Sequence, residues 1–222
     1  MIILYIFLCL LLGYIVGSIP VALVLGKTFR GIDIREHGSH NLGATNAGRV
    51  LGRKYFFAVM ILDAIKCGLG ILIGYLLYLI FKNYDIDNYY TTGLALAGTS
   101  AMIGHCYPIF ADFRGGKGVS TAAGYLLLTT PLCAVIGLII FTIIVLKKRY
   151  ISLGSIIVSI YVIIVTWILY FIFGESYPFM WLNMELNLGY CIITTLFALT
   201  VIFKHRENIK RLLNHCENKI NF

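Results

Sequence analysis

The sequence contains few charged residues for its length. Of its 222 residues only 13% are Asp, Glu, Lys or Arg, whereas 59% are hydrophobic, and the mean hydropathy is +0.88. A chain of this size cannot cover so much apolar surface inside one water-soluble core. The composition therefore excludes a soluble globular protein and predicts an integral membrane protein.

Common catalytic and metal-binding motifs are also absent. The histidines form neither an HExxH nor an HxxxD pattern, which argues against a zinc site and against a His–Asp acid–base motif. No GxSxG elbow and no paired carboxylate occurs. The six cysteines include no CxxC pair and most lie in hydrophobic runs, so we expect small buried residues rather than disulfides or metal ligands.

The sequence has no internal repeat, low-complexity run or linker. Its length and short loops leave no room for a separate soluble catalytic domain, so we expect one integral membrane domain over residues 1–222. The net charge of +8 would suggest nucleic acid in a soluble protein. Here the Lys and Arg residues lie in short loops between hydrophobic spans, where they set topology, and no nucleic-acid partner is expected.

The hydrophobic runs predict an all-α, polytopic bundle of transmembrane helices. Residues 2–25 carry no charge and lack the basic start and the cleavage site of a signal peptide, so we interpret them as the first span. Within this span, Gly13, Gly17 and Ser18 favour close helix contact, and Pro20 favours a kink near its end.

The number of spans depends on residues 118–146, which are long enough to cross the membrane once. One crossing would put the basic triplet 147–149 outside, against the positive-inside rule. Five spans are the alternative count that we keep. A break near Thr129-Thr130-Pro131 would instead give two short or tilted segments and seven spans, which we prefer. The expected spans are about 2–25, 55–81, 91–110, two segments within 118–146, 151–173 and 188–203.

Seven spans give a consistent charge distribution. Every Lys and Arg except Lys66 and Lys82 then lies in a cytoplasmic segment. We therefore expect the N-terminus outside and the C-terminus in the cytoplasm. Within the second span, Asp63 and Lys66 are neighbours on one helix face, and we favour a mutual ion pair that braces a polar loop over direct substrate contact.

The longest polar stretch, residues 38–49, follows the first span. Its glycines let the backbone bend and approach a ligand closely, and its short polar side chains offer hydrogen bonds, while Arg49 adds a fixed positive fork. Such a loop suits a phosphate, although the same composition is typical of any connecting loop. The glycines are Gly38, Gly43 and Gly48, and the polar residues include Ser39, Asn41, Thr45 and Asn46.

A second polar segment, residues 114–121, is glycine-rich. It is not a GxxxxGK[ST] loop, because Ala111 stands where the first glycine belongs and Gly118 where Ser or Thr belongs. Its flexible backbone, Lys117 and a helix start at Val119 or Ser120 still favour an anion without implying ATP. The alternative is that Lys117 binds no anion and only marks this loop as cytoplasmic through its positive charge.

A third polar segment, 205–208, follows the last span. His205 and Asn208 are three residues apart, so they share a face if 204–214 is helical, although a histidine in a basic tail is commonly a solvated surface residue. Three such segments on one side of a membrane predict a single phosphate-binding site.

Taken together, these segments resemble the bacterial acyl-phosphate:glycerol-3-phosphate acyltransferase family. Order and spacing of the motifs match almost from end to end, which makes the resemblance more specific than any single loop. The matching segments are 17–20, 32–49, 62–66, Gly104-His105 with Pro108, 114–121 and 205–212.

The resemblance implies a seven-span enzyme of the bacterial plasma (inner) membrane with its site facing the cytoplasm. It implies transfer of a fatty acyl group from acyl phosphate to the 1-hydroxyl of glycerol 3-phosphate, which yields 1-acylglycerol 3-phosphate (lysophosphatidate) and phosphate as the first step of phospholipid synthesis. The expected partners of this enzyme are acyl phosphate, glycerol 3-phosphate and the lipid bilayer. No metal, other cofactor or obligate protein partner is expected.

The resemblance also implies roles for individual residues. The phosphate of acyl phosphate is expected at Gly43, Ala44, Thr45 and Asn46. Glycerol 3-phosphate is expected at Ser39, Arg49, Lys117, His205 and Asn208, of which Ser39, Lys117, His205 and Asn208 form the expected catalytic set. His205 acts either as a base or as an orienting group. Asn41, Gly115, Gly116 and Gly118 complete the substrate-binding set, and Ser152-Leu153-Gly154-Ser155 resembles a further element near the site.

The chain departs from the family at three positions. His40 and His215 stand where glycine is usual, so a positive φ at position 40 would carry a cost, and Cys67 replaces the glycine expected after Lys66. None of the three is assigned to chemistry. Two other functions stay open: a transporter or channel for an organic phosphate, which polar loops and an intramembrane Asp63–Lys66 pair also suit, and a purely structural membrane protein.

Overall fold

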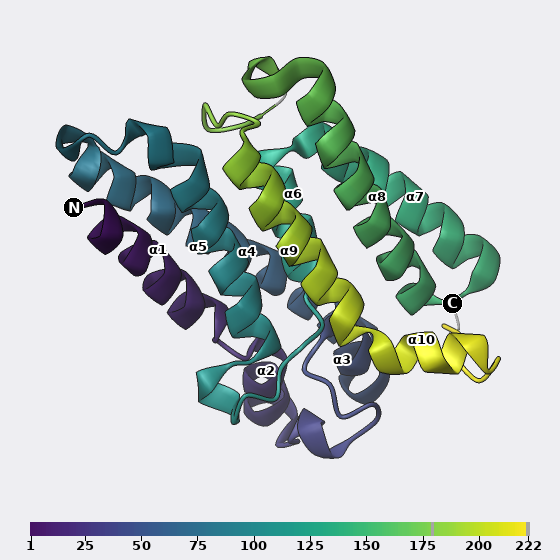
Figure 1. The fold of residues 1–222 in the computed structure, drawn as a ribbon. Coiled ribbons are helices and arrows are strands. Elements are labelled where there is room, and N and C mark those ends of the chain that lie inside the picture. The colour runs from purple at the N-terminus through teal and green to yellow at the C-terminus, as the bar shows by residue number, and fades with distance from the viewer. Residues whose placement is uncertain (179, 221–222) are drawn as a thin grey trace. The chain divides into compact units, whose positions relative to one another are not determined.

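The computed structural model describes residues 1–178 and 180–220 as helices joined by short loops (Figure 1). Among these residues there is no strand, which confirms the all-α prediction. The chain forms two compact units, Met1–Tyr125 and Leu126–Phe222. The single domain expected from the sequence stays a prediction.

Three long helices make up the frame of the first unit: α1 (Ile2–Gly17), α4 (Arg53–Phe81) and α5 (Tyr90–Cys106). They pack against one another along their lengths (Figure 1). The contact between α1 and α5 is so close that a methyl group at Gly13 or Gly17 would overlap the backbone of α5, and glycine at these positions permits it. The small residues of the first span therefore serve helix packing, as predicted.

Shorter elements of the first unit carry its polar loops. The first span breaks at Ser18–Pro20 and continues as α2 (Val21–Arg30), as the proline predicts. Next come η1 (Ile34–Glu36) and α3 (Ala44–Leu51), which precede α4. After α4 the elements are η2 (Lys82–Tyr84), η3 (Asp87–Tyr89), α5, η4 (Ile109–Ala111) and α6 (Val119–Thr129), whose last residues belong to the second unit.

The second unit is built on α7 (Pro131–Lys148), α8 (Ile151–Phe173) and α9 (Leu188–Lys204), with α8 packed against both of the others (Figure 1). η5 (Gly174–Ser176) follows α8, and α10 (Arg206–Leu213) follows α9. The predicted break is confirmed, because α6 ends at Thr129 and Pro131 is the first residue of α7, where its missing N–H costs nothing.

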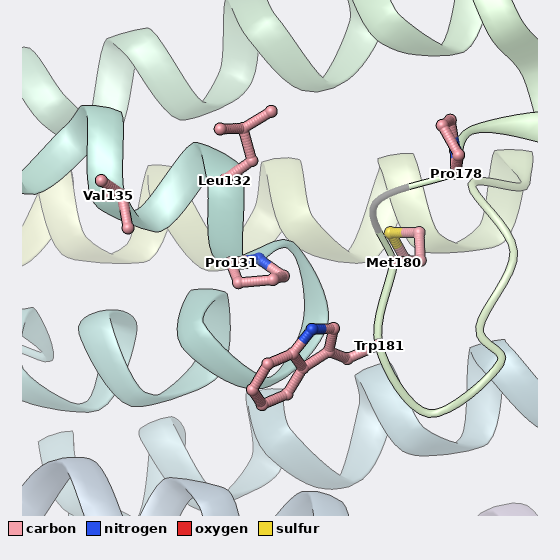
Figure 2. Close-up of a pocket in the computed structure, with 6 residues that line it drawn as sticks. All are labelled: Pro131, Leu132, Val135, Pro178, Met180 and Trp181. Carbon is pink, nitrogen blue, oxygen red and sulfur yellow. The ribbon is translucent and has the colours of Figure 1, made fainter.

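Beside this break lies an apolar pocket of about 350 Å³ (Figure 2). Trp181 extends towards Pro131, and the Trp181 backbone N–H donates to the Thr129 carbonyl at 3.1 Å. The lining residues are Pro131, Leu132, Val135, Pro178, Met180 and Trp181. None of the described lining residues is titratable or nucleophilic, so the pocket carries no candidate chemistry.

Five segments of the described residues are long and apolar enough to cross a membrane: Ile2–Arg30, Arg53–Tyr84, Asp87–Ala111, Pro131–Lys148 and Ile151–Ser176. Helices α9 and α10, bent by 54°, supply a sixth if they are taken together. Helix α6 has 11 residues, and at about 1.5 Å per residue it covers roughly half of a 30 Å hydrocarbon core. A multi-pass membrane protein is confirmed, whereas seven spans and the sides of the termini stay predictions.

Candidate active site

Asn46 organises the first polar loop from within. Its side-chain oxygen accepts a hydrogen bond from the Ser39 backbone N–H at 2.8 Å, and its amide nitrogen donates to the carbonyls of His37 at 3.0 Å and Ile34 at 3.3 Å. The residue is 1% exposed. Because the amide already has three backbone partners, Asn46 shapes the loop that the sequence assigns to phosphate.

Two residues of this loop adopt the left-handed conformation. Gly38 has φ +64°, and a Cβ there would overlap the Asn46 side-chain oxygen, so this turn requires glycine. His40 has φ +56°, which confirms that position 40 carries the cost expected from the sequence. Its Nδ1 lies 2.8 Å from the Arg35 carbonyl oxygen, a hydrogen bond that offsets part of that cost.

Helix α3 begins at this loop without a side-chain cap. Its N-cap is Gly43, whose own N–H donates to the Asn41 side-chain oxygen at 2.9 Å. The backbone N–H groups of Asn46 and Ala47 donate to the Gly43 carbonyl. Within the described part of the chain, the backbone N–H groups of Ala44 and Thr45 have no acceptor. The helix therefore begins with donors that an anion can accept.

The glycine-rich segment is tied directly to the first loop. The Asn41 amide nitrogen donates to the Gly115 carbonyl at 3.2 Å, across 74 residues of sequence, and Arg35 Nη1 donates to Asp112 at 2.7 Å. Lys117 lies half-buried between Gly116 and Gly118, directly before α6. The structure thus brings the first two predicted segments together within one unit.

An ion pair fixes the approach to this junction. Asp33 accepts three hydrogen bonds from Arg35, through the backbone N–H, Nε and Nη2, at 2.8–3.0 Å. The Arg35 guanidinium hydrogen-bonded to Asp33 holds the pKa of that carboxyl well below its usual range, and Lys27 at 3.5 Å adds to the effect. The carboxylate is therefore charged throughout the physiological pH range.

In the second unit, His205 lies where α9 meets α10. Its Nδ1 is 2.8 Å from the Val201 carbonyl oxygen, and the residue is 3% exposed. A carbonyl only accepts, so Nδ1 carries a proton, and in the neutral ring Nε2 is the acceptor. His205 is therefore a buried residue with a fixed tautomer, not the solvated surface residue that a basic tail would suggest.

Asn208 and Ser152 share a partner that the sequence reasoning missed. Glu217, in the tail after α10, accepts from Asn208 Nδ2 at 2.8 Å and from the Ser152 hydroxyl at 3.1 Å, both through Oε1. Its Oε2 accepts from Arg211 Nε at 2.7 Å. The carboxylate therefore orients Asn208, and only a prediction of how the tail folds back could have found it.

Comparison with known proteins identifies the family. The family model for glycerol-3-phosphate acyltransferase matches residues 7–215. The chain belongs to this family. A glycerol-3-phosphate acyltransferase of Bacillus velezensis is 39% identical over 213 residues, which cover 96% of each chain. The acyltransferase family and the glycerol-3-phosphate acyltransferase activity expected from the sequence are therefore confirmed.

Solved structures of the family agree with the fold. The crystal structure of PlsY (YgiH), an integral membrane glycerol 3-phosphate acyltransferase, in its glycerol 3-phosphate form matches with a TM-score of 0.77 and 32% identity, over 97% of this chain and 96% of that one. Its lysophosphatidic acid form matches with a TM-score of 0.76 and 31% identity, over 97% and 95%. The acyltransferase family thus shares this helical architecture.

Proposed function

We propose that the chain transfers a fatty acyl group from acyl phosphate to the 1-hydroxyl of glycerol 3-phosphate, at the cytoplasmic face of a bacterial plasma membrane. One observation carries the proposal: two anion-receptive segments, the uncapped start of α3 and the glycine-rich loop, are joined by the Asn41–Gly115 hydrogen bond. A reaction between two phosphate-bearing substrates needs such paired sites.

The start of α3 suits the phosphate of the acyl donor. The amides of Ala44 and Thr45 point out of the helix N-terminus, where the helix dipole favours negative charge. The exposed Arg49 lies one turn after Thr45 on the same helix face and supplies a positive charge nearby. Neutralising the repulsion between two anions is the main electrostatic task of the site.

The reaction needs no covalent enzyme intermediate. Acyl phosphate is a mixed anhydride, so the 1-hydroxyl oxygen attacks the acyl carbonyl carbon, the bond from that carbon to the phosphate oxygen breaks, and phosphate leaves with the hydroxyl proton. We assign His205 and Asn208 to orienting glycerol 3-phosphate, because His205 Nδ1 and Asn208 Nδ2 are both held in place by protein acceptors.

The two-substrate assay tests the proposal in detergent. Phosphate release should require acyl phosphate and glycerol 3-phosphate together, and Lys117→Ala and Arg49→Ala should each raise a substrate KM by on the order of tenfold or more, since each removes a charge-assisted contact. The exposed Lys54→Ala is the matched control and should leave both KM values unchanged. Uptake of an organic phosphate into sealed vesicles without turnover would instead support a transporter.

We further propose seven spans, with α6 and α9 as the two short ones and with the polar loops in the cytoplasm. Support comes from the basic triplet Lys147, Lys148 and Arg149 at the end of α7, which the positive-inside rule places inside. A cysteine introduced at Lys148 into a cysteine-free variant should resist an impermeant thiol reagent added outside intact cells. Labelling there would refute the seven-span topology.

A further inference from the structure

Three ionisable side chains meet inside the spans of the first unit. Asp63 Oδ1 lies 2.9 Å from Lys66 Nζ and 3.4 Å from His105 Nδ1, and the three side chains are 2%, 6% and 5% exposed. Ionisable groups within a membrane are costly and are kept where a structural or functional role requires them. The predicted Asp63–Lys66 pair is present, but the sequence did not predict its contact with His105.

Lys66 has a role of its own at the break of the first span. Its Nζ donates to the Ile19 carbonyl at 2.9 Å, beside Pro20, where the helical hydrogen-bond ladder is interrupted. A cation is favourable at this end of α1, and Asp63 neutralises that cation. Repair of the helix break accounts for Asp63 and Lys66, but it gives no reason for a histidine as the second partner of Asp63.

His105 contacts the glycine-rich segment through both its backbone and its ring. Its carbonyl accepts the Gly116 N–H at 3.0 Å. A Cβ on Gly115 would overlap that carbonyl, and a Cβ on Gly116 would overlap Nε2 and Cε1 of the ring. The backbone at Gly116 thus rests on the imidazole, whose opposite nitrogen faces Asp63.

We propose that His105 is a positioning residue that sets the path of the glycine-rich segment for the phosphate of glycerol 3-phosphate. Glycines give a segment no stiffness of their own, so an ordered path needs external support. Asp63 fixes the ring from inside the membrane, and the ring supports Gly116 immediately before Lys117. The proposal rests on the proposed function, since it assumes that this segment binds substrate.

The first test separates ring support from stability. His105→Asn keeps a donor for Asp63 but removes the part of the ring beneath Gly116. We expect its KM for glycerol 3-phosphate to rise about tenfold, with less than about a twofold change in the KM for acyl phosphate. Without the ring, the glycine-rich segment must become ordered when glycerol 3-phosphate binds, and that loss of entropy weakens binding. The matched control is Ser100→Ala, a buried hydroxyl of α5 that bonds the Leu10 carbonyl, which should lower the melting temperature without changing either KM.

A second test works from the loop side and removes no buried polar group. Gly116→Ala pushes a methyl group into the ring and should also raise the KM for glycerol 3-phosphate. In the double variant, His105→Asn makes room for that methyl, so the two effects should be strongly non-additive, with a KM close to that of His105→Asn alone. KM increases that multiply in the double variant would overturn the proposal, as would an unchanged KM in both single variants.

Failure of this inference can be told apart from failure of the proposed function. If Lys117→Ala raises the KM for glycerol 3-phosphate while the His105 and Gly116 variants leave it unchanged, the segment binds substrate and the ring does not position it. If Lys117→Ala also leaves that KM unchanged, the assignment of the segment to glycerol 3-phosphate is wrong, and with it the role given to His105.

Discussion

Replacing Asn46 distinguishes a residue that builds the loop from one that binds phosphate directly. Asn46→Ala removes the partner of the Ser39 N–H and one of the partners of the Ile34 and His37 carbonyls, each of which keeps another backbone bond. At about 1 kcal/mol for the N–H and about 0.5 kcal/mol for each carbonyl, the loss is about 2 kcal/mol.

Asn46→Asp should cost more, although it has nearly the same shape. One carboxylate oxygen can still accept from Ser39, but the other replaces a donor and faces the carbonyl oxygens of Ile34 and His37. A buried charge beside two acceptors is unfavourable, so we expect a loss above about 3 kcal/mol. The order, with Asp less stable than Ala, is the signature of a structural amide.

Thermal unfolding in detergent and steady-state kinetics together check this prediction. For a chain of this length, 2 kcal/mol corresponds to a fall of about 4–8 °C in the melting temperature. Asn187→Ala, which removes the single cap bond to the Tyr190 N–H, is a control that should lose about 1 kcal/mol. If Asn46→Ala unfolds like the wild type while its KM for acyl phosphate rises, Asn46 is a phosphate ligand and the structural reasoning fails.

Three further predictions concern the loops and the tail. Glu217→Gln keeps a single acceptor oxygen; when that oxygen accepts from Arg211, an amide donor faces Asn208 Nδ2, so kcat/KM should fall by about tenfold through misplacement of Asn208, and an unchanged value would contradict this role. His40→Ala should be less stable than His40→Gly by about 1 kcal/mol in thermal unfolding, because the Cβ of alanine is strained at the positive φ of this position and glycine has no Cβ. Because the pKa of Asp33 is lowered, its stabilisation is complete above about pH 4 and is lost as the pH falls further. The melting-temperature difference between the wild type and Asp33→Asn should therefore be constant from about pH 8 to about pH 5 and should shrink below about pH 4; a change between pH 8 and pH 5 would refute it.

Local features were predictable because their causes are local. The break at Pro131 follows from the missing N–H of proline and from the basic triplet at the end of α7, and the close packing of α1 follows from its small residues. Comparison with the glycine of the family pointed to position 40 as one where a positive φ would be costly, and His40 has that φ. The long helices were predictable from the hydrophobic runs, because each crossing of a membrane requires about 20 apolar residues in sequence.

Relations between distant residues were not predictable from composition or spacing. The resemblance to the family placed Asn46 at the phosphate, but its three partners are backbone groups that only the folded loop brings near. Glu217 belonged to no motif, and His105 belonged to a matching segment of the family but had no role assigned to it. Their roles depend on how the tail and the glycine-rich segment return to helices formed elsewhere in the sequence.

The buried Asp63–Lys66 pair has a consequence for biogenesis. Helix α1 is synthesised before α4, so the Ile19 carbonyl is already present as an acceptor for Lys66 when α4 enters the bilayer. Asp63 gains its second partner only after α5 has delivered His105. Until then α4 carries an incompletely compensated carboxylate in lipid, so a nascent chain truncated between α4 and α5 should be retained less firmly by the membrane than one extended past residue 106.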